Sequence, residues 1–414
     1  MASLLPLPQT GTYVQSVRES CRALRSGSSV KISQEAVRRF LLSPAFANSF
    51  ERLQTAHGVT MPLKFPSVAA ELNLISVLAL LNFASGYRVP LHVATGRGAY
   101  DNIRALLFSL YLTSAEGSGA DNLLSAKGMV TITRDKVAEL MNISIRQEKP
   151  VPGIPGVVMS EVGGPLLELV DLIVSAMVET GSILLNGGYP DLGAFVLEAL
   201  SEAKRAADKS DPGSMASAEV ILERLVKAFP AFQDMSLIDG TPVYVFKKAL
   251  FLIHAIVLRF ASSKAVPLPD TSTLPVFSDN VLPSMLVHLG VIDISECTVG
   301  SLKGIFLDSK DQLNAFLSSG PVPSEGTGAN KAPPKQGPHL SKEEAYVLRA
   351  SAVDACELIV ETARAIEIPE DEEKQTWLRN IKLPQLDGWL WAVAKDRLDY
   401  RSLERFVETS TVFY

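Results

Sequence analysis

Residues 274–290 read Leu-Pro-Val-Phe-Ser-Asp-Asn-Val-Leu-Pro-Ser-Met-Leu-Val-His-Leu-Gly, and this stretch decides how the rest of the chain is interpreted. A short apolar run ends at Phe277, one carboxylate follows at Asp279, and an apolar-periodic segment begins at Pro283. Asp279 therefore precedes a predicted helix start. Two interpretations are open. Asp279 either caps the helix, favoured by the helix dipole, or is a catalytic acid held on a loop.

The composition is that of an ordinary globular protein. The chain has 414 residues, of which 47% are hydrophobic and 20% are charged, so it can bury a large core. We expect a single helical domain over residues 1–414. Variable loops rich in Gly, Ser and Pro are predicted at residues 113–160 and 318–340.

The charge and the cysteines limit the partners and the compartment. The net charge is −6 and no basic stripe recurs, so we expect no polymeric nucleic acid as a partner, whereas a single nucleotide remains open. The three cysteines, Cys21, Cys297 and Cys356, have no metal-ligand spacing, and their odd number argues against a disulfide framework. The N-terminus lacks the pattern of a signal peptide. We therefore expect the cytoplasm, with the nucleus as the alternative.

The predicted fold is mainly α, with few short strands. Two long apolar segments, residues 68–84 and 244–260, read as buried helices, and their charged members would be costly in lipid, so we expect no membrane partner. Periodicity predicts another helix at residues 301–317. Strand-like segments are residues 128–132 and 275–277.

Three polar residues in the long apolar segments are candidates for a site. Asn82 either satisfies backbone groups at a helix end or faces a ligand. Lys247 and Lys248 lie near a helix start, which is electrostatically unfavourable for cations. An anionic partner would explain both lysines, whereas a surface position would explain only one of them.

The available chemistry is that of carboxylates with a cation and aromatic walls. The five histidines are too scattered to assemble a metal site, so we expect no metal. A carboxylate can stabilise or capture the cation-like transition state of glycosidic cleavage, and an aromatic shelf can stack a planar base. Glycosidic cleavage is one of several reactions compatible with this set: Asp279, Asp387, Lys247, Phe277, Trp389 and Trp391.

Several spaced motifs carry a resemblance to a known family. In chain order they are Leu63-Lys-Phe65, Glu71-Leu-Asn73, Leu81-Asn-Phe-Ala-Ser-Gly-Tyr-Arg88, Phe246-Lys-Lys-Ala249, Phe277-Ser-Asp279 with Pro283 and Leu289-Gly290, Asp387 with Leu390-Trp391, and Val412-Phe-Tyr414. Together they resemble the queuosine salvage protein family, the queuosine 5'-phosphate N-glycosylases, from about Val17 to the C-terminus. The resemblance implies a nearly all-helical fold similar to DNA glycosylases. It also implies release of queuine from queuosine 5'-monophosphate without metal or cofactor.

The resemblance further implies roles for individual residues. Asp279 falls on the family's nucleophile or oxocarbenium stabiliser. Lys247 falls on the lysine of a Lys-Lys-Ala pattern and either orients Asp279 or contacts the 5'-phosphate. Asp387 is expected to contact the base, as is His57, and Asn82 to shape the pocket. The expected substrate-binding residues are His57, Asn82, Phe277, Ser278, Asp387 and Trp391.

Some positions depart from the commoner family pattern. Asn280 replaces a tyrosine, Ser284 replaces a glutamine, and Thr409-Ser410 replaces an Arg-Asp pair. These changes leave the carboxylate of Asp279 in place, and they bear on substrate details and catalytic rate.

We therefore expect a cytoplasmic, monomeric hydrolase that releases queuine for salvage into tRNA modification. The rival hypothesis is a non-catalytic queuine- or nucleotide-binding protein, in which Asp279 only accepts a hydrogen bond.

Overall fold

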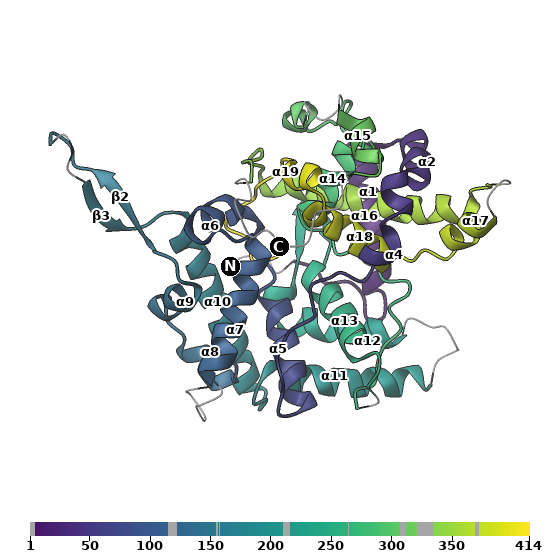
Figure 1. The fold of residues 1–414 in the computed structure, drawn as a ribbon. Helices are drawn as coiled ribbons and strands as arrows, with labels where there is room; N and C mark the ends of the chain where they lie inside the picture. Colours follow the sequence, from purple (N-terminus) through teal and green to yellow (C-terminus); the bar gives the residue numbers. More distant parts are fainter. Residues whose placement is uncertain are drawn as a thin grey trace.

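The computed structural model describes residues 5–114, 122–154, 156, 158–209, 216–263, 265–306, 312–320, 334–368 and 372–414. This part of the chain is mainly α-helical, as the sequence predicts, and its strands form small two-stranded antiparallel sheets (Figure 1). The pairs are β1 with β6, β2 with β3, and β4 with β5. That the chain is a single domain stays a prediction.

The elements follow one another in this order: α1 (Tyr13–Gly27), β1 (Lys31–Ile32), α2 (Gln34–Leu42), α3 (Pro44–Ala47), α4 (Phe50–Leu53), α5 (Val68–Leu80), η1 (Ser85–Tyr87), α6 (Arg88–Thr95), α7 (Ala99–Ser114), α8 (Ala126–Thr131), α9 (Arg134–Met141), β2 (Arg146–Pro150), β3 (Val158–Val162), α10 (Pro165–Asn186), α11 (Leu192–Ala207), α12 (Ala216–Ala228), η3 (Pro230–Phe232), β4 (Met235–Ile238), β5 (Thr241–Tyr244), α13 (Lys247–Phe260), α14 (Val281–His288), β6 (Ile292–Asp293), η4 (Gly300–Gly304), α15 (Leu313–Leu317), α16 (Lys342–Ala365), α17 (Glu372–Arg379), α18 (Leu383–Asp396) and α19 (Leu398–Ser402). The η elements are 3-10 helices.

The helices form two groups joined through the middle of the molecule. Helices α6 to α10 lie on one side, and the β2–β3 hairpin projects from them (Figure 1). Helices α1, α14, α16 and α18 lie on the other side, where α16 packs against α1, α14 and α18. Between the groups, α5 packs against α7, α11 and α13. Helix α13 also reaches the segment that precedes α14, where the ring centroids of Phe251 and Phe277 are 6.3 Å apart.

The two long apolar helices exist, with shifted ends. Helix α5 is buried on all sides from Leu72 to Leu80, but it ends before residue 84, because Ala84 has a left-handed φ of 101°. Helix α13 begins at Lys247 rather than at residue 244, because residues 241–244 pair with β4 and Phe246 has a φ of 48°. Apolar composition predicts burial, but the helix ends depend on these local conformations.

Other sequence predictions are wrong or only partly confirmed. Residues 128–132 do not form a strand: residues 126–131 form α8, capped by the Ser125 hydroxyl, which accepts from the Gly128 amide at 3.0 Å. Residues 275–277 are not paired with another strand in the described part of the chain.

Segment 113–160 is not one loop, since it holds α8, α9 and β2. The predicted helix at residues 301–317 is interrupted, because Phe306 has a φ of 59°, and residues 307–311 lie outside the described part. Of the loop predicted at 318–340, residues 321–333 also lie outside it.

Within the described residues, no single helix is long and apolar enough to span a membrane. Val68–Leu80 and Ser85–Thr95 meet the length and composition test only as a pair, bent by 65° at the break between them.

A buried ion pair joins α16 to the start of α13. Arg349 on α16 and Asp234 just before β4 have fully buried side chains, with Nη1–Oδ1 and Nη2–Oδ2 distances of 2.9 and 2.5 Å. Asp234 also accepts from the Tyr346 hydroxyl at 2.9 Å and from the Lys247 amide at 3.1 Å. Arg349 Nε donates to the carbonyl of Ser278 at 3.0 Å. One ion pair thus positions both Lys247 and the residue next to Asp279.

Replacing Arg349 should therefore destabilise the fold strongly. Arg349→Met leaves Asp234 buried without its counter-ion, which costs about 3–5 kcal/mol of unfolding free energy. Denaturant titration measures this loss of unfolding free energy. The matched control is Lys204→Met, which removes an exposed i,i+4 pair with Asp208 and should change stability by no more than about 0.5 kcal/mol. Equal losses in the two variants would contradict this account.

Candidate active site

Asp279 is buried at the start of α14, with 5% of its surface exposed. Its Oδ1 accepts from the amides of Val281 at 2.7 Å and Leu282 at 3.4 Å, so the capping interpretation is confirmed for this oxygen. In the described part of the chain no hydrogen bond to Oδ2 is recorded. Capping therefore fixes the carboxylate and leaves one oxygen for another partner, so the two interpretations of Asp279 are compatible.

The backbone around Asp279 is held from two sides. The Phe277 amide donates to Asp387 Oδ2 on α18 at 2.7 Å. The Ser278 hydroxyl donates to the carbonyl of Arg349 at 3.0 Å, and the Ser278 side chain is fully buried. Phe277 therefore lies at the site through both its ring and its amide. The hydroxyl of Ser278 holds the segment against α16, and its contact with substrate stays a prediction.

Lys247 and Lys248 are both buried and find their partners at the end of α5. Lys247 Nζ donates to the carbonyl of Asn82 at 2.7 Å, and Lys248 Nζ donates to the carbonyl of Leu80 at 2.7 Å. Carbonyl groups at a helix C-terminus favour cations. Neither lysine therefore needs an external anion, and the recorded contact of Asn82 at this site uses its backbone oxygen.

The ammonium of Lys247 is electrostatically coupled to Asp279. Burial lowers the pKa of Lys247 to about 8, and the charges of Asp279, Asp234 and Asp387 oppose this shift, whereas Arg349 adds to it. Burial also lowers the pKa of Lys248 well below its usual range. Which of the two roles predicted for Lys247 it performs stays a prediction, since its recorded hydrogen bond is to the Asn82 carbonyl.

Asp387, His57 and His254 form a buried polar cluster beside Phe277. Asp387 Oδ1 lies 3.4 Å from His57 Nε2, and both side chains are almost fully buried. This is close contact without an aligned hydrogen bond, because neither ring nitrogen of His57 has a recorded hydrogen-bond partner in the described structure. The approach depends on Gly388, where a Cβ atom would lie 2.6 Å from His57 Cε1. Burial raises the pKa of Asp387, and His57 partly offsets the rise.

His254 is a site residue that the sequence reasoning missed. Its ring lies 5.0 Å from that of His57 and 5.5 Å from that of Phe277, centroid to centroid. Its Nδ1 lies 3.1 Å from the hydroxyl of Thr271, and burial lowers the pKa of His254 to about 3. The available signal was its spacing, since a residue seven positions after Lys247 lies on the same face of a helix.

The two tryptophans of the candidate set, Trp389 and Trp391, have different environments. Trp389 is fully buried, donates from Nε1 to the Ser49 hydroxyl at 2.8 Å, and packs on Phe46, so its proposed place in an aromatic shelf is wrong. Trp391 is partly exposed and lies edge-on to Tyr100, with a centroid distance of 5.1 Å. It also approaches Gly58, the neighbour of His57. Of these two tryptophans, Trp391 is the one with exposed surface.

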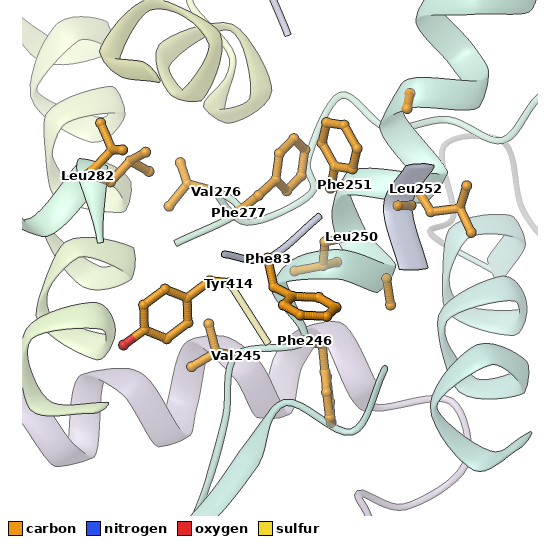
Figure 2. Packing of buried hydrophobic residues seen from close by; sticks show 14 of the residues in the cluster. Phe83, Val245, Phe246, Leu250, Phe251, Leu252, Val276, Phe277, Leu282 and Tyr414 are labelled. Carbon is orange, nitrogen blue, oxygen red and sulfur yellow. The ribbon is translucent and has the colours of Figure 1, made fainter. Parts of the chain in front are cut away.

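Aromatic and aliphatic side chains surround the polar cluster. Figure 2 shows Phe277 beside Phe251, and their centroids are 6.3 Å apart. Phe83 and Phe246 lie nearby, toward the start of α13 (Figure 2). The site is thus a set of polar groups in a dry environment, which strengthens electrostatic interactions. Groups of His, Cys, Asp and Glu placed to hold a metal ion are not found among the described residues.

Two hollows recorded in the structure lie away from this cluster. One of about 320 Å³ is lined by ion-paired residues of α1 and α16, including Arg25 and Asp354. Another of about 450 Å³ lies between α10 and Ser410. Neither hollow is lined by a candidate site residue, so the candidate site is located by its buried polar side chains.

Comparison with known proteins confirms the resemblance predicted from the sequence. Residues 121–305 match the family described as queuosine salvage protein. A protein of Sphaerobacter thermophilus named queuosine 5'-phosphate N-glycosylase/hydrolase is 26% identical over 220 residues, which are 53% of this chain and 56% of that protein. Proteins of the same name from Bos taurus and Mus musculus are 25% and 24% identical, over 58% and 72% of this chain and 60% and 79% of their own lengths. The alignments with the first two relatives thus span less than two thirds of those proteins.

The family match and the site overlap in part. Lys247, Phe277, Ser278 and Asp279 lie inside the matched residues, whereas Asp387 and the other predicted substrate-binding residues lie outside them. Asp387 nevertheless contacts the matched part of the chain, because its Oδ2 accepts a hydrogen bond from the amide of Phe277.

The neutral state of His254 predicts a loss of stability in acid. Its pKa is about 3 in the folded protein and about 6.5 in an unfolded chain. The unfolded chain therefore binds more protons between these values, and stability falls as the pH drops below about 6.5. From pH 7 to pH 5 this group should remove about 2 kcal/mol.

The test compares unfolding free energies at pH 7 and pH 5. His254→Asn should show a smaller loss than the unmodified protein, by about 2 kcal/mol. The exposed control His339→Asn should leave the pH dependence unchanged. The prediction concerns the difference between two pH values, so a general destabilisation of the His254 variant does not affect it. Identical pH dependence in all three proteins would contradict it.

Proposed function

We propose that this chain, a relative of the queuosine salvage proteins, hydrolyses the N-glycosidic bond of queuosine 5'-monophosphate and releases queuine for salvage into tRNA modification. The observation that carries the proposal is the buried carboxylate of Asp279. Its Oδ1 is held by two backbone amides, and the ammonium of Lys247 lies within electrostatic reach. The names of the relatives support the reaction class and the substrate.

A fixed carboxylate suits this reaction for a physical reason. Cleavage breaks the bond between the anomeric carbon and the base nitrogen, and positive charge builds up on the ribose. A purine glycosylase can ease departure by protonating N7, but a 7-deazaguanine has carbon there. More of the barrier therefore falls on stabilising the ribosyl cation, which is the task of an oriented anion in a dry site. Water then supplies hydroxide to the anomeric carbon and a proton to the departing base.

Asp387, His57 and Phe277 are proposed to hold the base. Asp387 is fixed by the Phe277 amide and has His57 against its other oxygen. A buried acceptor next to flat rings can receive hydrogen bonds from the amide and amino groups of a deazaguanine, which lie in the ring plane. Trp391, at the more open edge, is proposed to cover the ligand.

Removing the charge of Asp279 should abolish most of the activity. Asp279→Asn keeps the shape of the side chain, and release of queuine should fall by at least about 10²–10³-fold, the scale of one electrostatic contact to a transition state. The rate of queuine release from the monophosphate is measured by chromatography of the products. Asp270→Asn is the matched control, because Asp270 is exposed and its Oδ1 also accepts an amide two residues on, from Ser272 at 2.8 Å.

This experiment also separates the proposal from its rival. A non-catalytic binding protein would retain the monophosphate without forming queuine in either the unmodified or the variant chain. Release of queuine by Asp279→Asn at the unmodified rate would show that the assignment of Asp279 is wrong.

The Lys247 ammonium predicts an alkaline limit to activity. Its pKa is lowered to about 8, so it loses its proton, and its support of Asp279, as the pH rises through that value. We expect kcat/KM to fall above pH 8. In Lys247→Arg the guanidinium stays charged, so the fall should move to higher pH even if the maximal rate is lower. An unchanged alkaline limb in Lys247→Arg would exclude this role.

A further inference from the structure

The side chains of the candidate site are closed off from solvent. Asp279 is 5% exposed, and His57, Phe277 and Asp387 are each 3% exposed. A nucleotide has to reach these groups to react, and substrates commonly enter such closed sites through the movement of a loop. A part of the chain that borders the site must therefore move before the substrate can enter.

Residues 54–67, which we call the strap, are the least constrained part of this border. The strap joins α4 to α5, carries His57 and contains no helix or strand. Among the described residues, no backbone-to-backbone hydrogen bond is recorded for residues 58–66. The segment before Asp279 is also irregular, but Asp387 and Arg349 hold it through hydrogen bonds. Since segments with few internal bonds open at the lowest cost, the strap is the part that can move most easily.

One face of α7 holds the strap in place. Three side chains of this helix donate hydrogen bonds to backbone carbonyls of the strap. The contacts are Tyr100 Oη to Gly58 at 3.2 Å and His57 at 3.4 Å, Arg104 Nη2 to Thr60 at 3.1 Å, and Tyr111 Oη to Lys64 at 2.9 Å. Positions 100, 104 and 111 share one side of a helix. Because the acceptors are backbone groups, these contacts fix the path of the strap.

The other side of the strap packs against α18, which belongs to the opposite group of helices (Figure 1). A Cβ atom at Gly388 would lie 2.2 Å from the carbonyl oxygen of Gln54 and 2.6 Å from His57 Cε1. Gly58 has a left-handed φ of 70°, and a Cβ atom there would lie 3.2 Å from the ring of Trp391. The strap therefore closes the space between α7 and α18 on the side of His57.

We propose that the strap is the gate of the nucleotide site, which opens to admit the substrate and closes with His57 against the base. This inference rests on the proposed function. Tyr100, Arg104 and Tyr111 are positioning residues, since they act through the backbone of the strap. Their hydrogen bonds exist in the closed state, whether the site is empty or occupied, and break when the strap opens. Each bond therefore slows ligand entry and exit equally and leaves the affinity unchanged.

The first test measures the rates of queuine binding in Tyr111→Phe, which removes one hydroxyl donor seven residues along the strap from His57. The loss of one hydrogen bond changes an opening equilibrium by about 5-fold. The association and dissociation rate constants should therefore both rise by about 5-fold, while Kd stays within about twofold. Stopped-flow tryptophan fluorescence measures both rates, because Trp391 borders the strap.

The matched control is Tyr189→Phe, which removes a hydroxyl that donates to Glu198 at 3.0 Å on the connection between α10 and α11. Its rates should equal those of the unmodified protein. A general loss of structure in Tyr111→Phe would lower the fraction of protein that binds and would leave the association rate constant of the remainder unchanged. An unchanged association rate constant in Tyr111→Phe would overturn the proposal.

The second test prevents the strap from closing. In Gly58→Ala the new Cβ atom would lie 2.7 Å from Tyr100 Cε1, so the closed state becomes less populated and Kd for queuine should rise by about 10-fold. Gly96→Ala is the matched control, because Gly96 has the same φ of 70° and its Cβ atom would meet nothing within 4 Å. Both variants carry the same backbone cost, which denaturant titration measures. Equal affinities for queuine in the two variants would contradict the gate.

Binding of queuine needs no catalysis, which separates this inference from the proposed function. If no queuine is released from the monophosphate but Tyr111→Phe accelerates queuine binding and dissociation, the gate holds and the proposed reaction fails. If queuine is released but Tyr111→Phe changes neither rate constant, the gate is wrong. An unmodified protein that does not bind queuine would also overturn the gate.

Discussion

The structure depends on the buried ion pair between Arg349 and Asp234. Two charges without exposure to water are costly unless each donor and acceptor is satisfied. Here the carboxylate accepts from the guanidinium, from the Tyr346 hydroxyl and from the Lys247 amide, while Arg349 Nε holds the carbonyl of Ser278. Helix α16 thus fixes, through one side chain, the two chain segments that bear the proposed catalytic residues.

Asp279 is positioned by its backbone as much as by its side chain. Asp387 holds the Phe277 amide, Arg349 holds the Ser278 carbonyl, and the Val281 amide holds one carboxylate oxygen. Two of the departures from the family pattern, Asn280 and Ser284, contact the C-terminal segment. The Asn280 side chain donates to the carbonyl of Phe406 at 2.8 Å, and the Ser284 hydroxyl accepts from the Phe406 amide at 3.3 Å. Both residues anchor the C-terminal segment. These two departures therefore change contacts near Asp279 and leave its carboxylate in place.

Helix ends supply much of the electrostatics. Lys247 and Lys248 start α13, where the dipole disfavours cations, but the carbonyls of Leu80 and Asn82 at the end of α5 offset this. Burial then lowers both pKa values, and the charge of Lys247 is maintained near neutral pH with the help of Asp279. In contrast, His254 stays neutral because burial lowers its pKa to about 3 and the neighbouring His57 adds to this shift.

The sequence by itself determined the helical class, the two buried apolar helices and the family resemblance, because these follow from local patterns of burial and spacing, whereas it left open whether Asp279 caps α14. It could not determine the ends of α5 and α13, the strand pairing of residues 235–244, or the core position of Trp389, since each depends on contacts between distant segments. The partners of Arg349, His254 and Tyr111 were likewise decided only by tertiary structure. A side chain is assigned as an ion-pair partner, a neutral ring or a donor to a distant carbonyl by what the fold places beside it, and no local pattern in the chain carries that information.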